Sequence, residues 1–120
     1  MKNVILIKHP KNWGLNEEEV KEKAKKALNF FKFKENVELS VIFVGRKRAK
    51  ELNIKYRKMD YIPQVLGFPM SKIADKDGYI RLGDVVICTA KLRYEMNFLK
   101  KNRSEILSEW LIHGVENLIK

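Results

Sequence analysis

The densest group of residues that could bind an anion lies between positions 46 and 58. Seven basic side chains occur there: Arg46, Lys47, Arg48, Lys50, Lys55, Arg57 and Lys58. One acid, Glu51, accompanies them. Basic side chains spread around a helix would contact phosphates along a nucleic acid strand and make its binding steeply salt-dependent. The segment therefore predicts a nucleic-acid-binding helix, with a solvated helix face of no further function as the alternative.

Arg57, near the end of this segment, has the most specific potential chemistry. A guanidinium can hold a phosphate through two parallel hydrogen bonds and can stabilise the charge that develops in phosphoryl transfer. Asp60 follows closely in the chain and offers Arg57 an ion pair instead. The sequence leaves both roles open.

His113 is the candidate for base or metal chemistry near the end of the chain. Its spacing from Ile106 and Trp110 puts it on the apolar face of a helix, which is typical of a buried core histidine. Glu116 and Asn117 follow at helical spacing, so that all three side chains could converge. Asn117 is a poor substitute for a second histidine, because a neutral amide oxygen binds zinc weakly.

The roles of three other residues are less specifically indicated by the sequence. His9 follows the first expected strand and is interpreted as a loop histidine. Cys88 lies on an apolar strand and is expected to be a buried small hydrophobe. Asp84 begins the same strand, where an acid needs a partner such as Arg57 or Arg81. We predict a structural role for Asp84.

Charge and composition narrow the class of protein. The 120 residues include 25 Lys and Arg against 15 Asp and Glu, which gives a net charge of +10 and favours polyanionic partners. No apolar run approaches the roughly 20 residues that a membrane span needs. The single cysteine excludes an internal disulfide. These features predict a cytoplasmic, nucleic-acid-binding protein without a membrane partner.

Hydrophobic periodicity predicts the elements that must position these side chains. Strands are expected at 4–7, 37–44, 65–68 and 82–88. Helices are expected after Asn16, at 46–58, at 90–100 and from Asn102 onward, and both asparagines are candidate N-caps. Apolar residues on both faces of 37–44 predict a strand covered on both sides. The order indicates one α+β domain over 1–120, with a small mixed four-stranded sheet covered by about four helices.

Three segments in this order resemble conserved blocks of the YbeY family of bacterial rRNA maturation factors. They are Leu52-Asn53-x-x-Tyr56-Arg57-x-x-Asp60, Val65-Leu66-Gly67-Phe68-Pro69 and Leu82-Gly83-Asp84-Val85-Val86-Ile87-Cys88. The second block has Gly67 where the family usually has serine. The resemblance spans nearly the whole chain. It implies a YbeY-like fold and a single-strand-specific endoribonuclease of the small ribosomal subunit.

The family's metal motif, H-G-x-x-H-x-x-G-x-D-H, is matched only at its start by His113 and Gly114. Asn117 stands at the second histidine position, and the sequence ends at Lys120 before the third. Two of the three expected histidine ligands are therefore absent, and we expect no tightly bound zinc from one protomer. His113, with Glu116 and Asn117 as helpers, is the candidate metal site. The resemblance assigns Arg57 to phosphate binding.

Three functional hypotheses follow. The first is an rRNA-binding assembly factor that uses the basic helix and Arg57, with weak or metal-independent cleavage in which His113 or Glu116 is the base. The second is a metal-dependent endoribonuclease whose site is completed by His9, Asp84 or a second subunit. The third is a non-catalytic factor that binds a ribosomal protein. The sequence does not choose between them, nor does it fix the oligomeric state.

Overall fold

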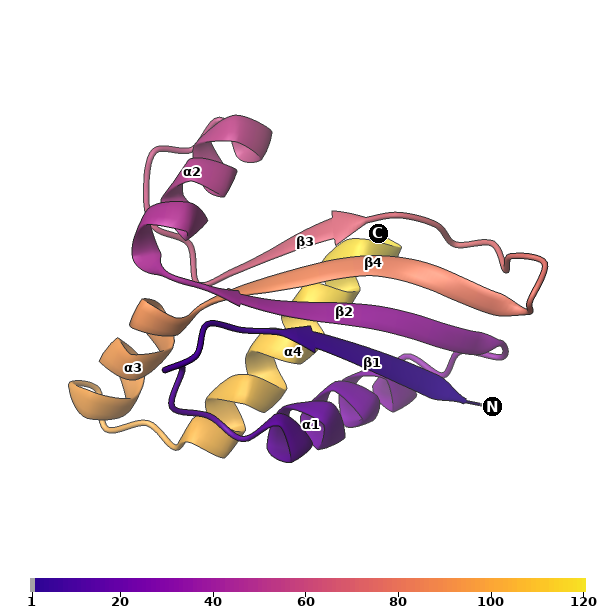
Figure 1. The fold of residues 1–120 in the computed structure, drawn as a ribbon, viewed down its shortest axis with the longest axis horizontal. Helices are drawn as coiled ribbons and strands as arrows, with labels where there is room; N and C mark the ends of the chain where they lie inside the picture. Colours follow the sequence, from indigo (N-terminus) through magenta and orange to yellow (C-terminus); the bar gives the residue numbers. More distant parts are fainter. Residues whose placement is uncertain (1) are drawn as a thin grey trace.

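The computed structural model describes residues 2–120, which form four strands and four helices (Figure 1). In chain order these are β1 (Asn3–Lys8), α1 (Glu17–Phe30), β2 (Asn36–Val44), α2 (Arg46–Arg57), β3 (Val65–Pro69), β4 (Tyr79–Cys88), α3 (Thr89–Asn97) and α4 (Arg103–Ile119). The predicted order of elements is confirmed. Two boundaries differ by more than one residue. Strand β4 begins at Tyr79 rather than at 82, because Tyr79, Ile80 and Arg81 pair with the start of β2. The third helix ends at Asn97 rather than at 100.

The sheet has the strand order β1-β2-β4-β3. The first three strands run parallel, and β3 runs antiparallel to β4 at one edge. The expected mixed four-stranded sheet is therefore present. Because the three parallel strands share a direction, their carboxyl ends lie at the same end of the sheet, and β3 begins there beside Ile87 of β4.

A bulge in β4 explains the glycine of the Leu82-Gly83-Asp84 block. The pairing with β2 passes from Arg81 directly to Gly83, which leaves Leu82 as the extra residue. Gly83 has a φ of 139°, a region that side chains rarely adopt, and a Cβ there would collide with the carbonyl oxygen of Phe68. The extra residue shifts the alternation, so that the core-facing set changes from Ile80 and Leu82 to Val85 and Ile87.

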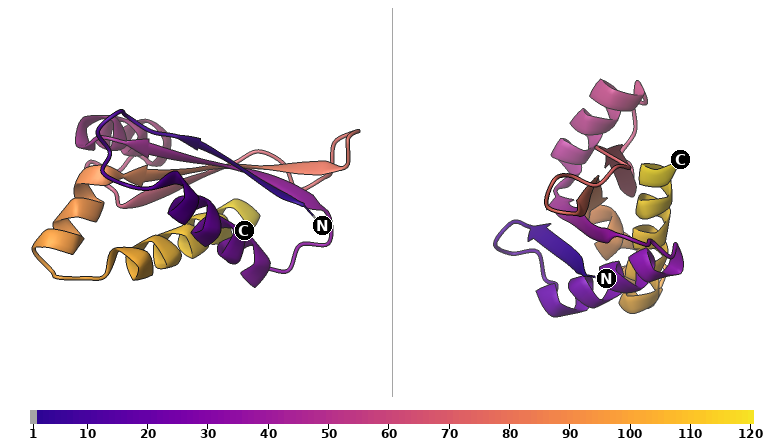
Figure 2. Two further views of the ribbon diagram at one scale, coloured as in Figure 1. Left: turned by 60° about the horizontal axis from the view of Figure 1, so that its bottom comes forward. Right: turned by 90° about the vertical axis from the view of Figure 1, so that its right-hand side faces the viewer.

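The helices lie unequally on the two faces of the sheet (Figure 2, left). Helices α1, α3 and α4 lie on one side and enclose the main core with the inward residues of β2, namely Val37, Leu39, Val41 and Phe43. Helix α2 lies on the other side and covers only one end, where Leu52 contacts a small cluster with Leu66 and Val86. The expectation that both faces of 37–44 are covered is therefore right for one face and only partly right for the other.

Both predicted asparagine N-caps are confirmed. The Asn16 side chain accepts hydrogen bonds from the backbone N–H groups of Glu18 and Glu19, and Asn102 accepts one from Glu105. Arg103, the first residue of α4, donates to both carboxylate oxygens of Glu19, at 2.9 and 3.2 Å, and so joins the first turns of α1 and α4. Within residues 2–120 no helix is long and apolar enough to cross a membrane.

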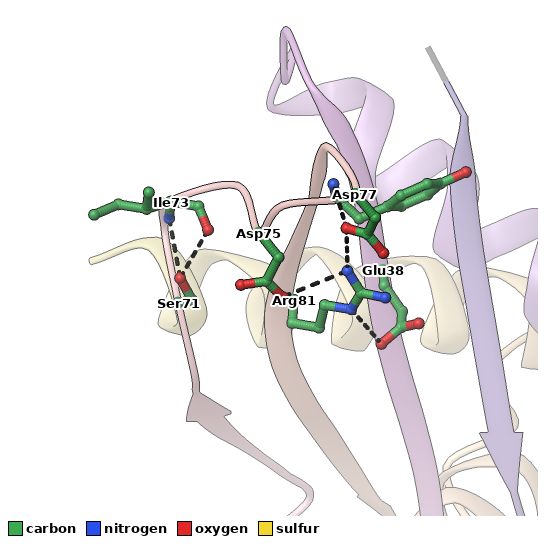
Figure 3. A network of polar contacts seen from close by, with 7 residues as sticks. Glu38, Ser71, Ile73, Asp75, Asp77 and Arg81 are labelled. Atoms are coloured by element: carbon green, nitrogen blue, oxygen red, sulfur yellow. Dashed lines mark hydrogen bonds and ion pairs between the residues drawn. The ribbon is translucent and has the colours of Figure 1, made fainter.

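A separate polar network stabilises the loop between β3 and β4, away from the helices that follow β2 and β4 (Figure 3). Arg81 lies 2.7 Å from Asp77, and 3.4 Å from both Asp75 and Glu38. The hydrogen bond from Arg81, with a second from the backbone of Tyr79, lowers the pKa of Asp77. The same pairing raises the pKa of Arg81.

Candidate functional site

The carboxyl ends of the parallel strands carry the candidate site, the usual place for ligands in sheets of this kind. Helix α2 follows β2 there and helix α3 follows β4. The central feature is a hollow of about 490 Å³, called here the Arg57 cavity. It is lined by Arg57, Tyr61, Ile62, Pro63, Gln64, Val65, Lys91, His113 and Asn117. Arg57 from α2 and His113 from α4, both predicted from the sequence, thus line the same cavity.

The lining of the Arg57 cavity is electropositive. Arg57 and Lys91 each contribute a positive charge, Gln64 and Asn117 contribute amides, and no Asp or Glu of residues 2–120 lines it. A concave site with charges of one sign attracts counter-ions, and Arg can bind an oxyanion through two donors. The arrangement suits a phosphate group.

Two features of α2 position Arg57. Lys58 ends the helix in the left-handed conformation, with its N–H directed to the carbonyl groups of Asn53 and Ile54. Asn53 is fully buried, and its side-chain amide donates to the carbonyl oxygen of Tyr61 at 3.0 Å. This bond ties the chain after the helix back to its last turns and brings Tyr61 to the cavity.

The alternative ion pair of Arg57 with Asp60 is wrong. Asp60 lies 3.4 Å from Lys50, and Arg57 takes part in no ion pair with the residues that the structure describes. Its guanidinium is exposed at the cavity. The charge of Arg57 is therefore available to an external anion.

His113 is exposed, so its interpretation as a buried core residue is wrong. The predicted stripe of α4 is buried around it, but His113 lies where the helix passes the edge strand β3, which leaves its side open. Asn117, one turn further on, lines the same cavity. Glu116 does not: its carboxylate is 3.9 Å from Lys120. Of the three side chains expected to converge, only His113 and Asn117 do so.

The donors present do not fit a zinc ion. Zinc prefers imidazole, thiolate and carboxylate ligands, whereas His113 shares its cavity with the neutral amide of Asn117. No cluster of three or more His, Cys, Asp or Glu side chains within residues 2–120 could hold a metal.

The other candidates do not line the Arg57 cavity. His9 stacks on Trp13 with ring centroids 3.9 Å apart, and its Nε2 is 2.9 Å from a carboxylate oxygen of Glu17. Asp84 is half-buried in a separate hollow on the face that carries α2. Its expected partner Arg81 is engaged by the loop acids instead. Cys88 is buried, as predicted.

The seven basic residues of 46–58 differ in their contacts. Arg48 pairs with Glu51 at 3.6 Å, Lys50 pairs with Asp60, and Lys58 donates to the carbonyl oxygen of Lys55. Lys47 is exposed. Arg57 lines the Arg57 cavity and Arg46 lines a hollow beside α3, whereas Arg48 lines the separate hollow on the face that carries α2.

Sequence reasoning missed the contribution of α3. A second hollow of about 650 Å³, called here the Tyr94 cavity, adjoins the first and shares Ile62 and Lys91 with it. Its other lining residues are Gly45, Arg46, Ala90, Arg93, Tyr94, Asn97 and Phe98. The sequence signal for this contribution was the segment 90–100, where basic and aromatic side chains occur on the same helix as the buried apolar residues.

Glu95 was also missed. It is 4% exposed, and its two carboxylate oxygens accept from the side chains of Gln64 and Lys101. It lines a smaller hollow of about 200 Å³ together with Glu109 and Trp110, and His113 lines both this hollow and the Arg57 cavity. Glu95 therefore holds Gln64, which immediately precedes β3, in the wall of the Arg57 cavity.

Comparison with known proteins places this geometry in context. A family model described as Endoribonuclease YbeY matches residues 7–119. Proteins named endoribonuclease YbeY from Aquifex aeolicus and Persephonella marina are 33% and 29% identical to the chain over 98% and 99% of its length. The matched regions span 76% and 77% of those proteins. A relative with the same name from Thermodesulfovibrio yellowstonii is 33% identical over 68% of the chain and 50% of its own length.

A solved structure resembles the fold. The solution structure of TM1509 from Thermotoga maritima superimposes with a TM-score of 0.61, covering 98% of this chain and 72% of that one, at 24% identity. At this identity the likeness supports the fold alone, which is the α+β architecture expected from the sequence.

Proposed function

The chain belongs to the endoribonuclease YbeY family, and from this premise we propose that it binds RNA in the Arg57 cavity and acts in rRNA maturation on the small ribosomal subunit. The observation that carries the proposal is the meeting of Arg57, Lys91 and His113 in one hollow without a carboxylate. These charges suit an RNA phosphate, and the net charge of +10 favours association with polyanions.

The same geometry supports slow cleavage that needs no metal. His113 accepts the proton of a ribose 2′-OH, and the freed oxygen attacks the adjacent phosphorus. The bond from phosphorus to the 5′-oxygen of the next nucleotide breaks, and that oxygen takes a proton from water. The products are a 2′,3′-cyclic phosphate and a 5′-OH, while Arg57 stabilises the charge on the phosphate. Glu116 is the weaker candidate base, because it pairs with Lys120 outside the cavity.

Binding to single-stranded RNA at graded salt tests the first part of the proposal. Each phosphate contact to a single strand contributes about 0.7 to the slope of log K against log salt. Arg57→Ala should weaken binding and lower the slope by about 0.7. Lys25→Ala on α1 removes the same charge far from the cavity and is the matched control. Equal effects of the two substitutions would reduce the role of Arg57 to net charge and contradict the proposal.

Cleavage of a labelled single strand, with and without chelator, tests the second part. We expect His113→Ala to lower the rate by about 10²-fold or more, and the products to carry cyclic phosphate in chelator. Activity that requires added metal and yields 5′-phosphate ends would favour the metal-dependent hypothesis. Binding to a ribosomal protein without any affinity for RNA would favour the non-catalytic one.

A further inference from the structure

We propose that Tyr94 and Phe98 form a platform on which unpaired RNA bases stack as the strand enters the Arg57 cavity. This inference rests on the proposed function and extends it, because it assigns the residues that contact the bases.

The first support is the geometry of the two rings. Tyr94 lies on α3 and Phe98 is its C-cap residue, one turn later, so both side chains project from the same face. Their centroids are 5.4 Å apart and their planes differ by 29°, which makes them nearly parallel. Tyr94 is 51% exposed and Phe98 is 74% exposed. Aromatic surface left open to this extent has no structural role in the core.

The second support is the charge around the platform. Arg46, Lys91 and Arg93 line the same cavity as the two rings, and no acid of the described chain lines it. None of the three takes part in the ion pairs of residues 2–120. Aromatic faces beside unpaired cations form the combination that binds single strands, with the rings contacting bases and the cations contacting phosphates.

The third support is continuity with the proposed phosphate site. Ile62 and Lys91 line both the Tyr94 cavity and the Arg57 cavity, so the two hollows adjoin. A strand whose bases rest on the platform would pass its backbone along Lys91 toward Arg57 and His113. Bases within a duplex are already stacked and paired, whereas unpaired bases can rest on an aromatic side chain. The platform therefore selects single strands.

The test separates base stacking from phosphate binding. The probes are a labelled single-stranded RNA of about 12 nucleotides, within the range of single-strand sites, and an abasic strand of the same length. The variant Tyr94→Leu/Phe98→Leu keeps the apolar surface but removes the rings, and Tyr94→Phe/Phe98→Tyr keeps both rings. Phe30→Leu on α1 removes a ring elsewhere whose exposure lies between those of Tyr94 and Phe98, and is the control. Circular dichroism verifies that each variant folds.

We expect the double leucine variant to bind the RNA at least about tenfold more weakly than the wild type, since stacking contributes about that factor or more per base. Its affinity for the abasic strand, and the RNA affinity of the aromatic-swap and Phe30→Leu variants, should change less than twofold. If the double leucine variant binds RNA as tightly as the wild type, the proposed platform is wrong, but the proposed phosphate site is not affected. No RNA binding by the wild type even at low salt overturns both.

Discussion

Gly114 lies directly against Val85, where α4 crosses β4. A Cβ at position 114 would lie 2.5 Å from one methyl carbon of Val85 and 2.9 Å from the other. The absence of a side chain therefore lets α4 approach the sheet closely enough to bring the neighbouring His113 to the Arg57 cavity. The glycine of the His113-Gly114 pair thus has a packing role that is separate from any ligand.

This contact predicts that Gly114→Ala destabilises the fold and impairs the site together. Overpacking costs about 1 to 3 kcal/mol, and the better helix propensity of alanine offsets about 1 kcal/mol. We expect a net loss of up to about 2 kcal/mol in the free energy of unfolding, measured by urea denaturation, and weaker RNA binding. The double variant Val85→Ala/Gly114→Ala should be more stable than the sum of the single changes, because the added methyl fills the space that valine leaves. Strict additivity would contradict the contact.

The sequence predicted the fold well because burial imposes regular spacing. Alternation in 37–44 and the stripe of the last helix marked the core correctly. The bulge at Gly83 was not predicted. It changes which residues of β4 face the core, and in the sequence this change looks the same as a continuous run of apolar residues. His113 was misassigned for a related reason. Helical spacing shows on which side of α4 the His113 side chain lies. Whether that side is buried depends on the position of the edge strand β3, which leaves it open.

The site was only partly predictable, because a dense group of basic residues in the sequence does not show which of them form ion pairs with acids. Arg48 and Lys50 look equivalent to Arg57 in the sequence, yet both pair with neighbouring acids while Arg57 does not. Lys91 and Arg93 belong to a less basic segment, and only the close ends of β2 and β4 bring α3 beside α2. The relevant residues were therefore divided between two segments that the chain order does not connect.

The pairing of Asp77 with Arg81 predicts a pH-dependent contribution to stability. The pKa of Asp77 is lowered in the folded protein, below the usual value of about 3.9. Its contribution is therefore complete above that usual value and is lost as the pH falls through the folded-state pKa. We expect Asp77→Asn to be less stable than the wild type at pH 6, with the difference shrinking toward pH 2. Thermal unfolding across this range measures it, and a constant difference would contradict the assignment.

The contact between Arg103 and Glu19 predicts a small, salt-sensitive coupling between α1 and α4. The hydrogen bond that Arg103 donates to Glu19 raises the pKa of Arg103, but both side chains are partly exposed. Such pairs contribute about 0.2 to 1 kcal/mol. A double-mutant cycle with Arg103→Gln and Glu19→Gln should give a coupling energy in this range that decreases at about 1 M salt. Arg103→Lys should lose much of the coupling, because lysine lacks the two-pronged geometry. A full coupling energy in that variant would argue against the bidentate contact.

The buried carboxylate of Glu95 predicts a link between stability and RNA binding. Glu95→Ala leaves Gln64 without its acceptor and should reduce the free energy of unfolding by about 1 to 3 kcal/mol. Glu95→Gln should cost less, since its amide oxygen can still accept from Gln64, although it loses the charge that pairs with Lys101. Glu109 lines the same hollow but is exposed, and Glu109→Ala is the matched control, expected to change stability by less than about 0.5 kcal/mol. Because Gln64 forms part of the Arg57 cavity, RNA affinity should decrease in the order wild type, Glu95→Gln, Glu95→Ala. If Glu95→Ala bound RNA like the Glu109 control while losing stability, the carboxylate would stabilise the fold without positioning the cavity wall.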